Sequence, residues 1–102
     1  LAEIVKDCES IVAIGVNCTM PEHVTSLLYK LSAKTSLPLV VYPNAGRVWD
    51  GENMCWIGEG HSTLPSKIVT EWVSAGATLI GGCCGLGPDA ITQLDNDLAQ
   101  LR

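Results

Sequence analysis

The chain has 102 residues and a mass of 10.8 kDa, which suits one compact domain or a part of one. Hydrophobic residues make up 47% of it and charged residues 17%, a balance that excludes a disordered chain. The net charge of −5 and the pI near 4.7 provide no basic face for a phosphate backbone, so no nucleic-acid partner is expected. No apolar run reaches the roughly 18 residues of a membrane span, and the first residues lack the order of a signal peptide, so a cytoplasmic protein without a membrane partner is predicted.

Five cysteines are the unusual feature of the composition. The number is odd, Cys83 and Cys84 are adjacent, and nothing marks export. Reduced thiols, a metal site or catalysis are therefore favoured over a disulfide framework. The chain begins with Leu1 rather than Met, which suggests a piece of a longer protein.

Helical and strand patterns alternate along the first half of the chain. Residues 1–10 have the spacing of the last turns of an amphipathic helix, with Cys8 on its apolar stripe. Residues 11–16 form a uniformly apolar strand, and a capping box at residues 19–22 then opens a helix that runs to about Lys34. A second buried strand at residues 38–42 is followed by a long loop that reaches residue 62.

The second half continues this order. Ser62 or Thr63 is expected to cap a third helix that ends at Gly76 in a left-handed conformation. Its predicted inward-facing residues are Leu64, Ile68, Trp72 and Val73. Residues 77–80 form a third short strand, and Gly87 precedes a last helix. The apolar stripe of that helix consists of Ile91, Leu94, Leu98 and Leu101.

This order predicts an α/β fold with three parallel strands that are covered on both faces. Three strands leave two open sheet edges, whereas a closed (β/α)₈ barrel needs about 250 residues. Residues 1–102 are therefore interpreted as the C-terminal part of such a TIM barrel, about three βα units with no second domain. A small open α/β sheet is the alternative. Open edges would make an isolated piece prone to association.

Thiols follow two of the predicted strands, Cys18 after the first and the Cys83-Cys84 pair after the third. Ligands of parallel α/β proteins bind where the carboxyl ends of strands converge, so the three thiols are expected to meet there. Three thiolates with one open position suit a catalytic zinc ion. Both members of the pair can reach one metal only if the backbone leaves the pleat, which the surrounding glycines permit. Core packing of free cysteines is the alternative.

Three motifs resemble, in order and spacing, those of the homocysteine S-methyltransferases. They are Gly-Val-Asn-Cys-Thr at residues 15–19, Tyr-Pro-Asn-Ala-Gly at 42–46 and Gly-Gly-Cys-Cys-Gly at 81–85. The resemblance covers essentially the whole chain. It implies that these segments end strands six to eight of a (β/α)₈ barrel and that Cys18, Cys83 and Cys84 bind a catalytic Zn²⁺.

The resemblance implies transfer of a methyl group to homocysteine, giving methionine. Zinc would hold the homocysteine sulfur as a thiolate, which attacks a methyl group on a sulfonium or ammonium donor. The Tyr-Pro-Asn string is most similar to members that use S-methylmethionine or S-adenosylmethionine, with betaine or a methylated folate as alternative donors. Asn17 and Asn44 are expected to bind substrate, the alternative being that each closes its own turn.

The sequence also departs from the family pattern. Ala-Gly-Arg at residues 45–47 stands where many users of S-methylmethionine have Ser-Gly-Glu, and Gly-Leu-Gly at 85–87 stands where Arg-Thr-Thr is common. Neither change touches a thiolate, so amino-acid recognition and donor identity are the properties affected. A truncated, non-catalytic fragment that binds zinc through its thiols and a redox-active Cys83-Cys84 pair remain as alternative functions.

Other conspicuous residues are given ordinary roles. His23 and His61 are interpreted as solvated polar residues, and Cys55 as a loop thiol near Trp56. Trp49 and Trp56 belong either to a lid or to a loop anchored by buried aromatic rings. The glycines between residues 81 and 87 lack the spacing of a dinucleotide loop, which excludes a nucleotide site there.

Overall fold

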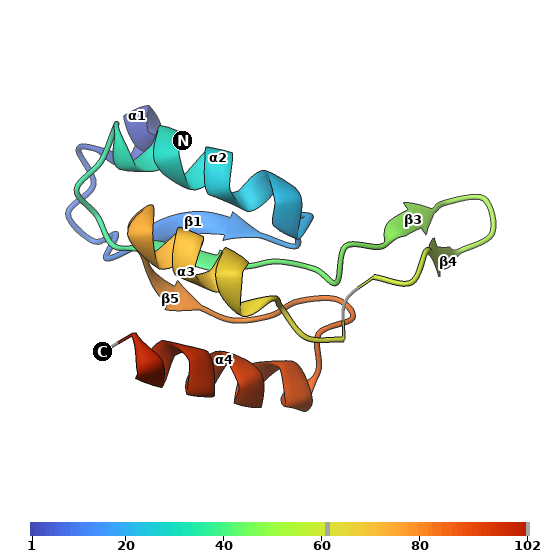
Figure 1. The fold of residues 1–102 in the computed structure, drawn as a ribbon. Helices are drawn as coiled ribbons and strands as arrows, with labels where there is room; N and C mark the ends of the chain where they lie inside the picture. Colours follow the sequence, from blue (N-terminus) through green and yellow to red (C-terminus); the bar gives the residue numbers. More distant parts are fainter. Residues whose placement is uncertain (61, 102) are drawn as a thin grey trace.

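A computed structural model describes residues 1–60 and 62–101 of the chain (Figure 1). The prediction for His61 therefore lies outside the described residues, whereas His23 is exposed as expected. The helices are α1 (Ala2–Val5), α2 (Pro21–Ser32), α3 (Ser66–Ser74) and α4 (Pro88–Gln100). The strands are β1 (Ile14–Asn17), β2 (Leu39–Tyr42), β3 (Val48–Asp50), β4 (Cys55–Ile57) and β5 (Ala77–Ile80).

Three of these strands form a parallel sheet in the order β1-β2-β5, which confirms the predicted parallel βα arrangement. Right-handed crossovers between strands that neighbour one another in chain order send every helix to the same face of the sheet. Accordingly α2 packs on β1 and β2, α3 packs on β5 and beside α2, and α4 lies next to α3 (Figure 1).

The expectation that both faces of the sheet are covered is wrong for the described residues. Leu39 and Val41 point to the helices and are buried, but Tyr42 is 40% exposed and Leu79 is 55% exposed on the opposite face. The physical reason is the sequential strand order, since a second helical layer requires the strand order to reverse.

The core lies between the sheet and the helices. Its largest fully buried residues include Trp72, Leu28, Leu39, Leu64, Val24, Val41 and Val69. Gly76 has a φ of 108° and ends α3 as predicted. The prediction for Val73 is wrong, because α3 packs between α2 and α4 through Val69 and Trp72, which leaves Val73 36% exposed.

The last helix α4 buries only one side of its predicted stripe. Leu94 is buried, whereas Ile91 is 45% exposed and Leu101 is 44% exposed. Among the described helices, α3 is the neighbour of α4, so residues that point away from α3 meet no partner there (Figure 1).

The N-terminal helix and the first strand are shorter than predicted. Helix α1 ends at Val5, so Cys8 lies beyond it and is exposed rather than in the core. Strand β1 starts at Ile14 because its partner β2 begins at Leu39 and offers no earlier ladder position.

The predicted helix caps are also wrong. Helix α2 begins at Pro21 with Met20 as N-cap, and the hydroxyl of Thr19 donates to the carbonyl of Asn17 (2.9 Å) instead of capping the helix. Helix α3 has Pro65 as its N-cap, so neither Ser62 nor Thr63 caps it. A proline beside the helix start fixes φ there, and the helix forms without a side-chain cap.

The sequence predicted only a long loop after β2, but this segment contains an antiparallel hairpin of β3 and β4. Trp49 pairs with Trp56, their rings meeting edge to face with centroids 5.3 Å apart. The carboxylate of Asp50 accepts hydrogen bonds from the backbone N–H of Glu52 (3.0 Å) and the side-chain amide of Asn53 (2.6 Å). Asp-Gly between β-forming residues was the signal for this turn.

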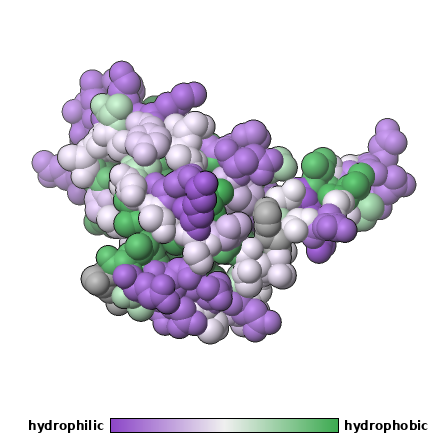
Figure 2. Space-filling model, viewed as in Figure 1, coloured by the Kyte–Doolittle hydropathy of each residue, from purple (hydrophilic) through white to green (hydrophobic). Residues whose placement is uncertain are grey.

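The hairpin projects from the carboxyl-terminal end of the sheet, well away from the body of the molecule (Figure 1). Hydrophobic residues cover part of its surface (Figure 2). Its exposed large hydrophobic residues are Val48, Trp49, Met54, Trp56 and Ile57. Cys55 lies in β4 and is exposed, so it belongs to a strand rather than to a loop. Within the described residues, no helix has the length and apolar character that crossing a membrane requires.

Candidate metal centre

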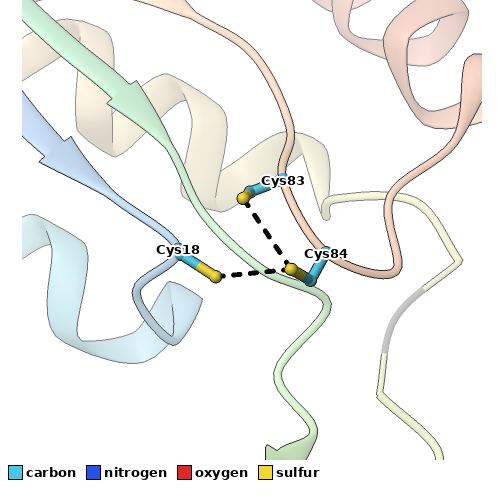
Figure 3. Close-up of side chains that lie close together, drawn as sticks. All are labelled: Cys18, Cys83 and Cys84. Atoms are coloured by element: carbon cyan, nitrogen blue, oxygen red, sulfur yellow. Dashed lines mark hydrogen bonds between the residues drawn. The ribbon is translucent and has the colours of Figure 1, made fainter.

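The structure brings Cys18, Cys83 and Cys84 together, as their positions after the strands predict. In Figure 3 Cys18 follows β1 on one side of β2, while Cys83 and Cys84 follow β5 on the other side, and the three side chains point toward one another. The Sγ of Cys84 lies 3.5 Å from that of Cys18 and 3.9 Å from that of Cys83. All three sulfur atoms lie within 4.8 Å of one another.

The backbone leaves strand geometry before each cysteine. Cys18 has a φ of 46°, in the left-handed region that residues other than glycine rarely adopt, and this turns its side chain out of the β1 alternation. Strand β5 ends at Ile80, so no strand pleat forces the side chains of Cys83 and Cys84 to point to opposite faces of the sheet. The departure from the pleat that a shared metal requires is therefore present.

Backbone hydrogen bonds with the end of β2 and the loop after it hold both cysteine segments in place. The N–H of Cys18 donates to the carbonyl of Tyr42 (2.9 Å), and the N–H of Cys83 donates to that of Pro43 (2.8 Å). The carbonyl of Cys84 accepts from the N–H of Ala45 (2.9 Å). The central strand thus sets the relative positions of thiols that are far apart in the sequence.

Gly85 allows the close approach of these two loops. It has a φ of 82°, and a Cβ at this position would lie 2.6 Å from the Cβ of Ala45. Any side chain would push the loop after β5 away from the loop after β2 and separate Cys84 from Cys18.

Asn44, predicted to bind substrate, is 6% exposed and its side chain contacts the backbone of Cys18. Its side-chain amide donates to the carbonyl of Cys18 (3.2 Å), and its side-chain oxygen accepts from the N–H of Gly46 (2.7 Å). Asn17 is exposed at the end of β1, where it borders a shallow hollow over the uncovered sheet face with Val40 and Tyr42. The structure therefore brings Asn44 to the thiols and leaves Asn17 facing a neighbouring surface.

The thiols perturb one another because they are so close. The hydrogen bond between Cys18 and Cys84 lowers the pKa of Cys18 below its usual value, and Cys83 makes the next largest contribution. The same hydrogen bond, followed by that with Cys83 and by the negative charges of both neighbours, raises the pKa of Cys84 to about 11. A first thiolate in the cluster therefore opposes a second one, and a bound cation would remove that opposition.

The donor set fits a thiolate-bound metal. Sulfur atoms at about 2.3 Å from a tetrahedral zinc ion lie about 3.8 Å apart. The observed separations of 3.5 and 3.9 Å are close to this value, and 4.8 Å is the upper bound for the remaining pair. Cys18 and Cys84 are exposed, so one side of the cluster is open to a further ligand.

Arg47 and Trp56 border the cluster, which the sequence did not predict. Together with Ala45, Cys84 and Gly85 they line a small hollow that encloses about 20 Å³. The position of Arg47 directly after the Tyr-Pro-Asn-Ala-Gly motif was the available signal, whereas Trp56 reaches the hollow only through the unpredicted hairpin.

Comparisons with known proteins agree with this geometry. The family model described as homocysteine S-methyltransferase matches residues 1–98. Homocysteine S-methyltransferase 3 of Arabidopsis thaliana is 44% identical over 93 residues, which are 88% of this chain and 26% of that protein. Selenocysteine Se-methyltransferase of Brassica oleracea var. italica is 37% identical over 102 residues, 97% of this chain and 29% of that protein.

A solved structure is similar as well. The metallated form of the homocysteine methyltransferase MmuM from Escherichia coli superimposes with a TM-score of 0.73 at 34% sequence identity, covering 93% of this chain and 27% of that one. The chain thus spans 26 to 29% of the length of the relatives named here. The resemblance carried by the three sequence motifs is confirmed, and the chain belongs to the homocysteine S-methyltransferase family.

Proposed function

We propose that this chain is part of a zinc-dependent enzyme that transfers a methyl group from S-methylmethionine or S-adenosylmethionine to homocysteine, giving methionine. The observation that carries the proposal is the cluster of Cys18, Cys83 and Cys84, whose sulfur atoms lie within 4.8 Å of one another at the carboxyl ends of parallel strands. Family membership supports homocysteine as acceptor, and the metallated form of the relative from Escherichia coli supports a metal.

The three cysteines would hold the zinc ion, which supplies a Lewis acid that keeps the acceptor thiol deprotonated at neutral pH. The chain's own groups prepare this arrangement. Asn44 fixes the backbone of Cys18, and the carbonyl of Pro43 fixes that of Cys83, so little movement is needed to bring the sulfur atoms around a metal. The exposed side of the cluster admits the acceptor.

Asn17 and Asn44 are proposed to contact substrate at this open side. Asn44 donates an amide N–H to the carbonyl of Cys18, and its side chain also reaches the Cys18 sulfur, so it adjoins the position of a metal-bound substrate. Asn17 is exposed beside Cys18 and is free to turn toward a bound molecule. A reducing compartment such as the cytoplasm is proposed because the cluster binds metal only as free thiols.

We further propose that residues 1–102 form the last three βα units of a (β/α)₈ barrel. Three features support this: the sequential order of parallel strands, the helices on one face, and the uncovered face with Tyr42 and Leu79. In a barrel the uncovered face lines the interior and both open edges are paired.

A chimaera tests the proposed function. Residues 1–98 replace the matching segment of the Escherichia coli methyltransferase, and methyl transfer to homocysteine is measured with each sulfonium donor. We expect transfer by the chimaera and by its Cys55→Ser variant, an exposed thiol outside the cluster, and a loss of more than about a hundredfold in Cys83→Ser. A folded, zinc-loaded chimaera that transfers no methyl group from either donor would overturn the proposal.

A further inference from the structure

The hollow beside the cysteine cluster is lined by groups of different chemistry: the guanidinium of Arg47, the ring of Trp56 and the thiol of Cys84. The space that it encloses is only about 20 Å³, far below the roughly 300–1,000 Å³ of pockets for drug-sized ligands or cofactors. It therefore suits one end of a small molecule whose other end lies at the cysteines.

Arg47 is held in place with most of its donors available. Its Nε donates to the carbonyl of Glu59 (3.1 Å), which uses one of the five N–H bonds of a guanidinium. Gly60 makes room for it, since a Cβ there would lie 2.8 Å from the Cγ of Arg47. Among residues 1–60 and 62–101 no carboxylate forms an ion pair with Arg47. Its terminal N–H groups therefore form a fork that suits a carboxylate.

A carboxylate can bind next to the cysteine cluster only if a positive group such as the Arg47 guanidinium offsets the negative charge there. The chain has a net charge of −5, and the cluster adds negative charge when its thiols ionise. A carboxylate brought next to these sulfur atoms would be repelled unless a positive group faced it. Arg47 is the basic residue that lines the hollow, and Trp56 offers an apolar wall for the methylene groups between a thiol and a carboxylate.

We infer that Arg47 binds the carboxylate of the thiol substrate and thereby selects thiols that carry a carboxylate a few bonds from the sulfur. The inference rests on the proposed function, because the cysteines must first hold the metal that binds the substrate sulfur. It assigns the sulfur of the substrate to the open side of the cluster and its carboxylate to the adjoining hollow.

Ligand binding tests this assignment without an activity assay. The reduced chain is loaded with Co²⁺, whose sulfur-to-metal charge-transfer band reports a new thiolate ligand. It is titrated with homocysteine and with 3-aminopropane-1-thiol, which is homocysteine without its carboxylate. We expect homocysteine to bind at least about tenfold more tightly, since a charged hydrogen-bonded pair contributes about that factor.

Three variants complete the test. Arg47→Gln should weaken homocysteine binding about tenfold and leave 3-aminopropane-1-thiol unchanged, so that the preference disappears. Arg47→Lys should keep part of the preference, because the charge remains but the fork is lost. Lys30→Gln removes one positive charge from α2, outside the hollow, and should change neither affinity.

The possible results distinguish a failure of the role of Arg47 from a failure of the metal centre. Equal affinities of the unmodified chain for both thiols, or an equal loss for both in Arg47→Gln, would overturn the role of Arg47 while leaving the metal centre intact. A folded chain that takes up no cobalt, or whose spectrum responds to neither thiol, would contradict a thiol-binding metal centre formed by this chain, and the role of Arg47 with it. Arg47 is exposed, so its replacement should leave the far-ultraviolet circular dichroism unchanged.

Discussion

At the residue scale, the cysteines depend on one another for their protonation. The contact with Cys18 is the largest cause of the raised pKa of Cys84, which is about 11. In metal-free protein Cys18→Ala should therefore lower the pKa of Cys84 toward the ordinary value of 9.0, and Cys84 should form a reactive thiolate at lower pH. Alkylation rates at Cys84 as a function of pH, measured by mass spectrometry, check this. A midpoint that stays near 11 in the variant would contradict it.

Loss of the Asn44 side chain should weaken both the stability of the chain and its zinc affinity. Asn44→Ala leaves the carbonyl of Cys18 without its amide donor, and we expect a loss of about 1–3 kcal/mol in stability and about 10–100-fold in zinc affinity. Asn96→Ala, at an exposed position of α4, is the matched control. Urea unfolding and chelator competition measure the two effects. Equal zinc affinities in both variants would show that Asn44 does not position Cys18.

How far the site could be predicted differs from residue to residue. The convergence of Cys18 with Cys83 and Cys84 follows from the position of each after a buried strand, because parallel strands bring their carboxyl ends together. The left-handed backbone at Cys18 has no comparable signal, since it is held by contacts with the loop after β2, which are distant in sequence. The same holds for Arg47, whose approach to Cys84 depends on where the hairpin leaves the sheet.

At the element scale, the turn of the β3–β4 hairpin has a built-in dependence on pH. The side chain of Asn53 and then backbone N–H groups lower the pKa of Asp50 from 3.8. A folded pKa below the unfolded one means that this stabilisation is present above the unfolded value and is lost as the pH falls through the folded one. The hairpin should therefore loosen in acid, below about pH 4, where the Asp50 carboxylate becomes protonated.

Asp50→Asn should remove this acid dependence and loosen the hairpin at neutral pH, because the amide is uncharged and accepts weaker hydrogen bonds. Indole N–H signals of Trp49 and Trp56, which form the edge-to-face pair, report hairpin closure in nuclear magnetic resonance spectra. Glu52→Gln is the control, because Glu52 contributes its backbone N–H rather than its side chain to the turn. Identical spectra of the two variants from neutral to acid pH would contradict the role of Asp50.

The elements that could be predicted are those with a repeated signal. β1, β2 and β5 are runs of β-branched and apolar residues, and α2 and α4 have apolar residues at helical spacing, so the parallel βα order follows. The strands of the hairpin have three residues each, too few for a period, and are fixed by pairing with each other. Val73 was misplaced because the rotation of α3 depends on both of its neighbours, which sequence spacing alone does not define.

At the scale of the whole molecule, the sheet has unpaired edges at β1 and β5 and an uncovered apolar face within the described residues. We expect the isolated chain to associate in a concentration-dependent way through these surfaces. Leu79→Lys places a charge on the 55% exposed Leu79 of that face and should reduce association. Ile91→Lys, on the exposed side of α4, should not. Light scattering after size-exclusion chromatography measures the mass, and a chain that is monomeric at every concentration would contradict the expectation.

The zinc content of the purified, reduced chain tests the central claim most directly, because it requires no assumption about the methyl donor. It is measured beside Cys83→Ser, which removes one of the three clustered sulfur atoms, and Cys55→Ser, which removes an exposed sulfur outside the cluster. The account predicts about one zinc ion per chain in the unmodified protein and in Cys55→Ser, and almost none in Cys83→Ser. A folded chain without zinc, or equal zinc in all three proteins, would contradict it.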